Sequence, residues 1–184
     1  TKTVYPSGSE VLYLYDVAGR VSRVQLKVGS TITTLADAIT YAPNGPITGM
    51  AFGDTASETR SYDTSYRLIG ITDLLGVTAL RQIGYGYDSR DDLTAVTDVL
   101  VPGNSETFTY TPRESLATAS GAYGALGFTY DSVGNRITHA ANPGTGLVTD
   151  TYAYPLTSNR LGTITLGVGV GGSRVYNYDA MGNV

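Results

Sequence analysis

The fold is decided by the stretch Tyr130-Asp131-Ser132-Val133-Gly134-Asn135-Arg136, because closely similar stretches recur along the chain. The other close copies are Tyr15-Asp16-Val17-Ala18-Gly19-Arg20 and Tyr178-Asp179-Ala180-Met181-Gly182-Asn183. Looser copies begin at Tyr62-Asp63 and Tyr87-Asp88. Three more starts keep the tyrosine without the aspartate: Tyr41, Tyr110 and Tyr154. Successive tyrosines are 26, 21, 25, 23, 20, 24 and 24 residues apart, so the chain is a tandem array of about eight repeats of one supersecondary unit.

Each repeat reads as a strand, a tight turn and a return strand. An aromatic residue precedes most repeat tyrosines by two positions, as in Phe128 and Tyr130, which places both rings on one face of a strand. The aspartate that follows suits the first position of a turn, where its carboxylate accepts backbone N–H groups. The glycine three residues later tolerates positive φ and closes a hairpin with a bulge. Tyr-Asp-x-x-Gly therefore predicts a β-hairpin.

The residues that carry this repeat are the predicted structural site of the chain. They are Tyr15, Asp16, Gly19, Tyr62, Asp63, Tyr87, Asp88, Tyr110, Tyr130, Asp131, Gly134, Tyr154, Tyr178, Asp179 and Gly182.

The other ends of the hairpins are longer, variable and rich in turn-forming residues. They are predicted at Gly53–Ser57, Val101–Ser105, Ala141–Gly146 and Gly167–Ser173. One edge of the sheet is therefore expected to carry short, uniform turns, and the opposite edge loops of changing length.

Two details depart from the simplest hairpin. Four repeats replace the turn glycine, with Tyr66, Asp91, Glu114 and Ser158. A bulky residue at positive φ costs about 1–2 kcal/mol, so we predict turns of another type there. The repeats at Tyr130 and Tyr154 are also expected to carry one extra residue before the return strand.

The return strands show apolar residues three apart, such as Val21 and Val24, or Leu68 and Ile71. In a flat strand, residues three apart lie on opposite faces. Either both faces are partly covered or a bulge intervenes, and the sequence leaves both alternatives open. Helix also matches this spacing, but glycine, threonine and β-branched residues disfavour it.

A single hairpin is marginal in water, so equivalent hairpins are expected to pack side by side into one sheet. Eight repeats of two strands give roughly 15 strands, and so wide an open sheet must curl. We therefore predict an all-β fold of tandem antiparallel hairpins that form a long curved or spiralling sheet. Residues 1–184 are expected to be one repeat region within a larger protein, with a ladder of aromatic pairs on one face.

Composition excludes several other classes. The 184 residues contain no Cys, which rules out disulfides and thiolate metal sites, and the net charge of −4 argues against nucleic acid. The sequence contains no run of about 18 apolar residues, so no membrane span is predicted, and no signal peptide is visible.

Tyr-Asp-x-x-Gly-Asn/Arg repeats at this spacing resemble the YD or RHS repeats of bacterial RHS proteins and of the C component of toxin complexes; teneurins carry a related repeat. The resemblance covers residues 13–184 and implies a β-ribbon that spirals into a hollow shell around a C-terminal effector. It implies that the chain is a structural shell or scaffold segment, secreted or at the cell surface. Its implied partners are the rest of the parent shell and an enclosed effector. The alternative is a cell-surface module that binds carbohydrate or a protein partner.

The resemblance also implies where the segment differs from a whole shell protein. Shell proteins of this kind end in a core region with Asp-Pro signatures and an aspartate-dependent self-cleavage site, and no Asp-Pro occurs here. Self-cleavage and toxin activity are therefore expected outside this chain. The isolated segment is expected to self-associate.

No residue set predicts catalysis, a cofactor or a metal. His139 is the only histidine, and no nucleophile motif accompanies it. Asp88, Asp91 and Asp92 share a turn but do not match a calcium loop, and the glycine-rich run 166–172 lacks the context of a phosphate-binding loop. The tyrosine ladder could stack on sugars, but structural packing explains it better. We therefore predict that the chain is not an enzyme.

Overall fold

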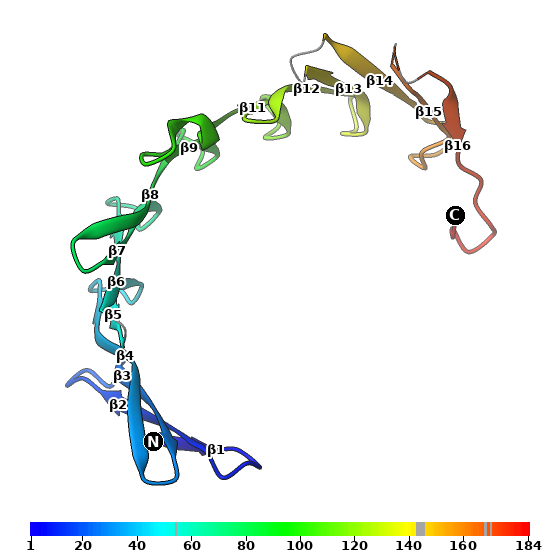
Figure 1. Ribbon diagram of the computed structural model, residues 1–184. Helices are drawn as coiled ribbons and strands as arrows, with labels where there is room; N and C mark the ends of the chain where they lie inside the picture. Colours follow the sequence, from blue (N-terminus) through cyan, green and yellow to red (C-terminus); the bar gives the residue numbers. More distant parts are fainter. Residues whose placement is uncertain (54, 143–145, 168, 170) are drawn as a thin grey trace. The chain divides into compact units, whose positions relative to one another are not determined.

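The computed structural model of the chain describes residues 1–53, 55–142, 146–167, 169 and 171–184. These residues form an antiparallel sheet of 16 strands in which neighbours in sequence are neighbours in space (Figure 1). The strands are β1 (Lys2–Val4), β2 (Glu10–Tyr15), β3 (Val21–Val28), β4 (Thr31–Tyr41), β5 (Ile47–Phe52), β6 (Ala56–Tyr62), β7 (Leu68–Leu75), β8 (Thr78–Tyr87), β9 (Leu93–Asp98), β10 (Glu106–Tyr110), β11 (Leu116–Gly121), β12 (Gly124–Tyr130), β13 (Arg136–Asn142), β14 (Val148–Ala153), β15 (Thr163–Thr165) and β16 (Ser173–Val175). A single 3-10 turn, η1 (Pro102–Asn104), is the one helical element in this part of the chain. The predicted all-β fold of tandem hairpins is confirmed.

The chain divides into two compact units. The N-terminal unit comprises Thr1–Tyr85 and Thr97–Pro102, and the C-terminal unit comprises Gly86–Val96 and Gly103–Val184. The contacts and grooves described below lie within one unit or the other. That residues 1–184 form one repeat region of a larger protein stays a prediction.

One five-residue turn, here called the Tyr-Asp turn, follows most repeat tyrosines. In the turn that begins at Asp16, the backbone N–H of Asp16 donates to the carbonyl of Arg20 at 2.8 Å. The N–H of the fourth residue, Gly19, donates to the carbonyl of Asp16 at 3.0 Å. The same two bonds close the turns at 42–46, 63–67, 88–92, 111–115, 131–135 and 179–183. Gly19 and Gly134 hold positive φ angles of 77° and 95°, which is why glycine suits the fourth position.

Three of the four turns without glycine keep this geometry. Tyr66, Asp91 and Glu114 adopt φ angles of 62°, 70° and 61°, so the prediction of another turn type is wrong for them. The bonds of the turn outweigh the local strain of a side chain in the left-handed region. Ser158 is not among the described residues with positive φ, and its turn does differ.

A bulge opens the return strand in five repeats and settles the spacing of its apolar residues. Tyr15 lies opposite Val21, but Leu14 lies opposite Arg23, so the register shifts by one residue between them. Val21 and Val24 therefore share the face of Tyr15 and Tyr13, and the bulge alternative is the correct one. The same shift occurs at Tyr41, Tyr62, Tyr110 and Tyr130.

The predicted extra residue is present in one repeat and absent from the other. Tyr152 lies opposite Ile164, one position later than the equivalent pair Phe128 and His139, so the Tyr154 repeat does carry it. Tyr130, however, lies directly opposite Arg136, as Tyr15 lies opposite Val21. The prediction is wrong for Tyr130: Arg136 itself occupies the position that is apolar elsewhere.

The loops at the opposite edge vary in length, as predicted. A two-residue turn of Gly29 and Ser30 joins β3 to β4, whereas residues 99–105, which include η1, join β9 to β10. The loops predicted at 53–57, 141–146 and 167–173 include Asp54, 143–145, Val168 and Val170, which lie outside the described residues.

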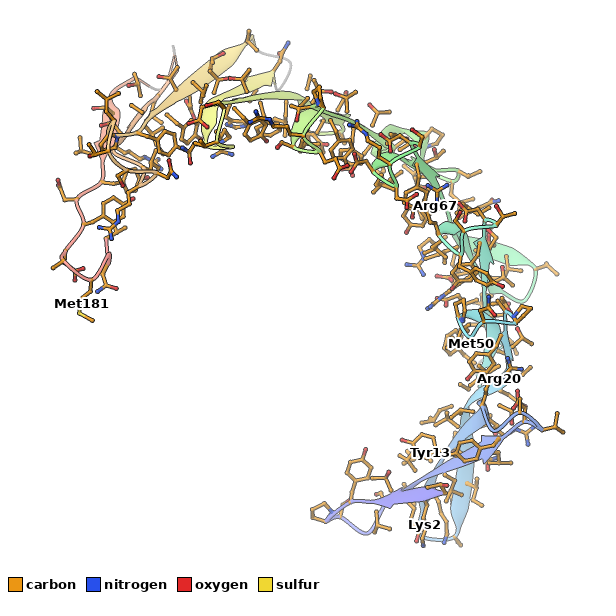
Figure 2. The ribbon with its side chains drawn as sticks, turned by 180° about the vertical axis from the view of Figure 1, so that it is seen from behind. Lys2, Tyr13, Arg20, Met50, Arg67 and Met181 are labelled. Carbon is orange, nitrogen blue, oxygen red and sulfur yellow. The ribbon has the colours of Figure 1, made fainter. Side chains whose placement is uncertain are left out.

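The two faces of the sheet differ in chemistry. The face that carries the repeat tyrosines, here called the aromatic face, alternates aromatic strands with aliphatic return strands; Phe108 faces Ala119, which faces Leu126. Tyr13 and Met50 of this face are labelled in Figure 2. The opposite face of the C-terminal unit carries small residues, among them the hydroxyl pairs Thr109–Thr118 at 2.6 Å and Thr129–Thr138 at 2.7 Å.

A single sheet layer leaves little fully buried. Ala119, at 5% exposure, is the one buried hydrophobic residue among those described. The chain exposes 11581 Å², whereas about 8,500 Å² is expected for a compact monomer of this mass. None of the described residues forms a helix with the length and hydropathy needed to cross a bilayer.

Candidate functional site

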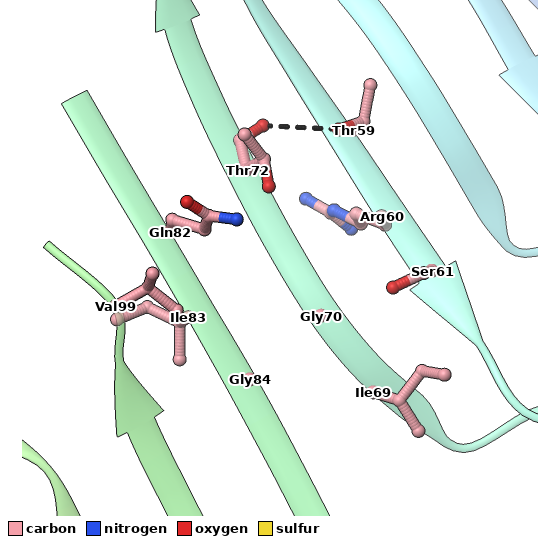
Figure 3. A pocket seen from close by; sticks show the side chains of 10 residues that line it. All are labelled: Thr59, Arg60, Ser61, Ile69, Gly70, Thr72, Gln82, Ile83, Gly84 and Val99. Carbon is pink, nitrogen blue, oxygen red and sulfur yellow. Dashed lines mark hydrogen bonds between the residues drawn. The ribbon is translucent and has the colours of Figure 1, made fainter. Parts of the chain in front are cut away.

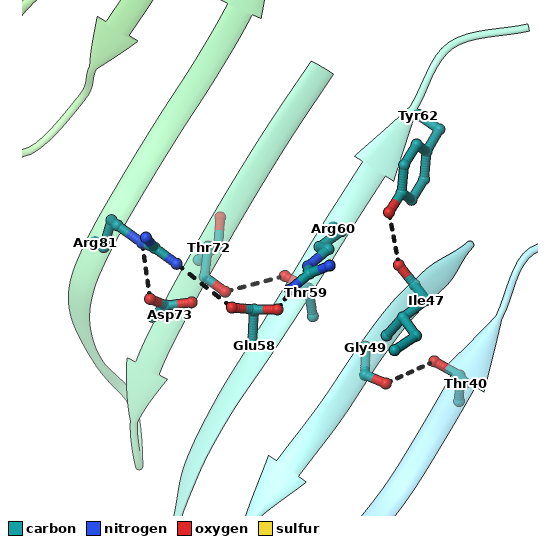
Figure 4. A network of polar contacts seen from close by, with 10 residues as sticks. All are labelled: Thr40, Ile47, Gly49, Glu58, Thr59, Arg60, Tyr62, Thr72, Asp73 and Arg81. Atoms are coloured by element: carbon teal, nitrogen blue, oxygen red, sulfur yellow. Dashed lines mark hydrogen bonds and ion pairs between the residues drawn. The ribbon is translucent and has the colours of Figure 1, made fainter. Parts of the chain in front are cut away.

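The repeat tyrosines bond each repeat to the one before it. The Tyr130 hydroxyl donates to the carbonyl of Leu116 at 2.9 Å, and Tyr154 donates to Arg136 at 3.1 Å. In each case the acceptor is the residue that leaves the preceding Tyr-Asp turn. Equivalent bonds, here called the tyrosine bonds, join Tyr41 to Val21, Tyr62 to Ile47 (Figure 4), Tyr110 to Leu93, and Tyr178 to Leu161.

The tyrosine bonds explain why the repeat uses tyrosine rather than phenylalanine. The ring packs on the aromatic face, and the hydroxyl satisfies a carbonyl at the bulge, where the ladder is interrupted. Burial raises the pKa of Tyr110 and Tyr154, which favours the neutral, donating hydroxyl. Tyr15 has no such bond with any described residue, and it is 46% exposed.

The turn aspartates organise the Tyr-Asp turns. One carboxylate oxygen of Asp131 accepts the backbone N–H groups of Val133 and Asn135, each at 2.9 Å, and the other accepts the Asn135 side chain. The same pattern of two backbone donors recurs at Asp16, Asp63, Asp88 and Asp179. Thr111 takes this place in the Tyr110 repeat, with longer bonds to Arg113 and Ser115.

These donors lower the pKa of the turn aspartates. At Asp16 and Asp88 a backbone N–H, of Arg20 and Arg90 respectively, has the largest effect on the pKa. At Asp179 the Asn183 side chain has the largest effect on the pKa. Partial burial raises the pKa of Asp63 and Asp131, but the N–H donors outweigh it.

The arginine that closes a Tyr-Asp turn pairs with the turn aspartate. Arg20 donates to Asp16 at 2.9 Å, and Arg67 donates to Asp63 at 2.7 Å. Arg20 also stacks on Tyr41, with its guanidinium carbon 4.8 Å from the ring centre. The turn arginine thus ties its own turn to the ring of the next repeat.

A charge network that sequence reasoning missed crosses the aromatic face of the N-terminal unit (Figure 4). The Glu58 carboxylate forms ion pairs with Arg60 at 2.6 Å and with Arg81 at 3.4 Å. Arg81 also pairs with Asp73 at 2.8 Å. Glu58, Asp73 and Arg81 are opposite one another on β6, β7 and β8, so strand register brings them together. These charged residues form no motif in the sequence. Only the strand register, including its bulges, would have shown that they lie together.

The groove in Figure 3 lies on the opposite face of the same unit. It encloses about 300 Å³ and is floored by Gly70 and Gly84, which lie opposite each other on β7 and β8. Ser61, Thr72 and Gln82 flank it. A side chain at Gly70 would meet Ser61 Oγ at 2.7 Å, so the groove depends on glycine. It is shallow and polar, without an ionisable nucleophile among its lining residues.

The other singled-out residues have structural partners. His139 stacks on Phe128 with ring centres 5.2 Å apart, and its Nδ1 lies 4.0 Å from Asp150. Asp88 is engaged in its own turn, in which Asp91 holds the positive φ. The glycine-rich run contains Val168 and Val170, which lie outside the described residues. In the part of the chain that the structure describes, no three potential metal-ligating side chains gather.

Comparison with solved structures finds the same fold in toxin complexes. The crystal structure of TcdB2-TccC3 matches with a TM-score of 0.71 and 22% identity, over 87% of this chain and 10% of that chain. The structure of the Photorhabdus luminescens Tc holotoxin pore matches with a TM-score of 0.66 and 17% identity, over 97% of this chain and 12% of that chain. No protein-family model and no curated protein matches the sequence.

These similarities show the fold. The chain has the repeat-hairpin architecture of a toxin-complex shell built of RHS repeats, and the resemblance read from the Tyr-Asp repeats is confirmed at that level. It spans about a tenth of the chains that it matches.

Proposed function

We propose that the chain is a structural segment of an RHS-type shell, with no catalytic role of its own. The tyrosine bonds are the observation that carries the proposal. The most regular side chains of the sequence are used to bond one repeat to the next, at hydrogen-bond distances of 2.7 to 3.1 Å. Hydroxyls that are engaged in this way do not serve as hydrogen-bond donors to a ligand.

The finer part of the proposal is that the shell encloses or presents a C-terminal effector, in a secreted or cell-surface protein. The similarity in fold to the TcdB2-TccC3 structures supports it, and one of these is described as lacking a hypervariable C-terminal region. The proposed partners are the remaining shell and that effector.

Protease protection tests the enclosure. The chain, expressed with the residues that flank it in its gene, is expected to shield the C-terminal region from protease until denaturant opens the sheet. Equal cleavage rates of that region with and without residues 1–184 would contradict enclosure.

A glycan array separates the shell role from a carbohydrate-binding module. The shell role predicts no saturable binding by the chain. Saturable binding that is lost in Tyr130→Ala and Tyr154→Ala, while Tyr15→Ala retains it, would favour the binding module instead.

A further inference from the structure

Arg136 lies in surroundings that differ from those of the turn arginines Arg20 and Arg67. Arg20 and Arg67 occupy the fifth position of a Tyr-Asp turn and pair with its aspartate. In the Tyr130 repeat that position holds Asn135. Its side-chain amide donates a hydrogen bond to Asp131 at 2.9 Å, in place of an arginine. Arg136 is thereby moved one residue on, to the place that Leu116 holds in the preceding repeat.

The aromatic face holds the Arg136 guanidinium between two rings. Its central carbon lies 4.3 Å from the Tyr152 ring centre and 5.9 Å from that of Phe128. Such contacts position a guanidinium while leaving the N–H groups at its edge free. Arg136 is half-buried, so its orientation is restricted by packing.

The acidic groups nearby are engaged elsewhere. Asp131 is bonded within its own turn, and Asp150 accepts the Gly167 N–H at 2.9 Å and lies 4.0 Å from His139. Among the described residues, the Arg136 guanidinium forms neither an ion pair nor a hydrogen bond. The Tyr152 hydroxyl likewise has no described partner.

We propose that Arg136 and Tyr152 form a binding site for an oxyanion, a carboxylate or phosphate group, on the aromatic face. A guanidinium fork matches two oxygens of either group, and the tyrosine hydroxyl supplies a further donor. The site goes beyond the proposed shell role, because it would bind an acidic group whether or not an effector is enclosed.

NMR of the arginine Nε–H groups in the full 184-residue chain tests the site, with sodium phosphate and sodium acetate as probes. The Arg136 signal is expected to shift saturably, together with the Tyr152 ring signals. The Arg20 signal is the internal control and is expected to stay in place, because Arg20 already donates to Asp16. Sodium chloride at equal ionic strength corrects for screening.

Arg136→Leu is the matched variant, since Leu116 and Leu161 leave the turns of neighbouring repeats. It is expected to fold and to abolish the Tyr152 shift, whereas Arg136→Lys, which keeps the charge without the fork, weakens it. A shift with phosphate alone identifies a phosphate group, and a shift with acetate identifies a carboxylate. No saturable shift with either probe, or a Tyr152 shift that persists in Arg136→Leu, would overturn the proposal.

Discussion

The repeat tyrosine acts through both of its parts, and the two can be separated by single substitutions. Tyr130→Phe keeps the ring and removes the bond to the Leu116 carbonyl. We expect it to lower the free energy of unfolding by about 1–2 kcal/mol, because a half-buried carbonyl loses its donor. Tyr15→Phe is the control, since Tyr15 has no such bond among the described residues. It should lower the free energy of unfolding by only a few tenths of the loss expected for Tyr130→Phe. Equal losses in urea denaturation would mean that the hydroxyl bonds do not contribute.

The fourth position of the Tyr-Asp turn is the second place where single residues decide stability. Gly134 holds a φ of 95°, so Gly134→Val places a β-branched residue in the left-handed region and should cost more than Asp131→Ala, which costs about 1 kcal/mol.

The reverse change is expected at Glu114, where φ is 61°. Glu114→Gly relieves the strain and should stabilise the chain by about 0.5–1 kcal/mol. Chemical denaturation of the three variants gives the order of their free energies of unfolding. A loss of stability in Glu114→Gly would contradict the expected relief of strain.

At the scale of the element, the turns make stability depend on pH in one direction. The pKa of each turn aspartate is lower in the folded chain than the ordinary value of 3.8, because the N–H donors favour the carboxylate. The stabilisation is therefore complete above pH 3.8 and is lost as the pH falls through the lower, folded pKa. Thermal melting should show a stable plateau at neutral pH and a decline below about pH 4. A replacement of the turn aspartates by asparagine should flatten that decline, and an unchanged decline would assign the acid sensitivity to other carboxylates.

The hairpin is also the element that the sequence predicts best. Asp131 and Gly134 report local backbone geometry, which a short motif can specify, so the turn and the strands beside it follow from the motif alone. The Arg136 position was misjudged because an arginine lies there, opposite Tyr130, where other repeats carry an apolar residue such as Val21 or Leu116. The bond from Tyr154 to Arg136 and the network of Glu58 with Arg81 join residues 18 and 23 positions apart. Contacts of that kind depend on strand register, which accumulates over several hairpins and cannot be read from one repeat.

At the scale of the whole molecule, the balance of exposed surface predicts association. The chain exposes roughly a third more area than a compact monomer of its mass, and apolar side chains such as Val17, Leu156 and Met181 (Figure 2) stand well exposed at the turns. Among the described residues, the edge strands β1 and β16 each pair with one neighbouring strand. Open strand edges and uncovered apolar faces are the features through which sheets join.

We therefore expect the 184-residue chain to self-associate at micromolar concentration in sedimentation experiments. Edge pairing would be head-to-tail, and such a contact does not close by itself, so the apparent mass should keep rising with concentration. Packing of two aromatic faces would instead give a dimer whose mass reaches a plateau. Glu58 and Arg81 place charge on that face in the N-terminal unit, so added salt should affect the dimer more than the edge-paired polymer. A stable monomer at every concentration would contradict the association predicted here and would mean that the sheet covers its own edges and faces in solution.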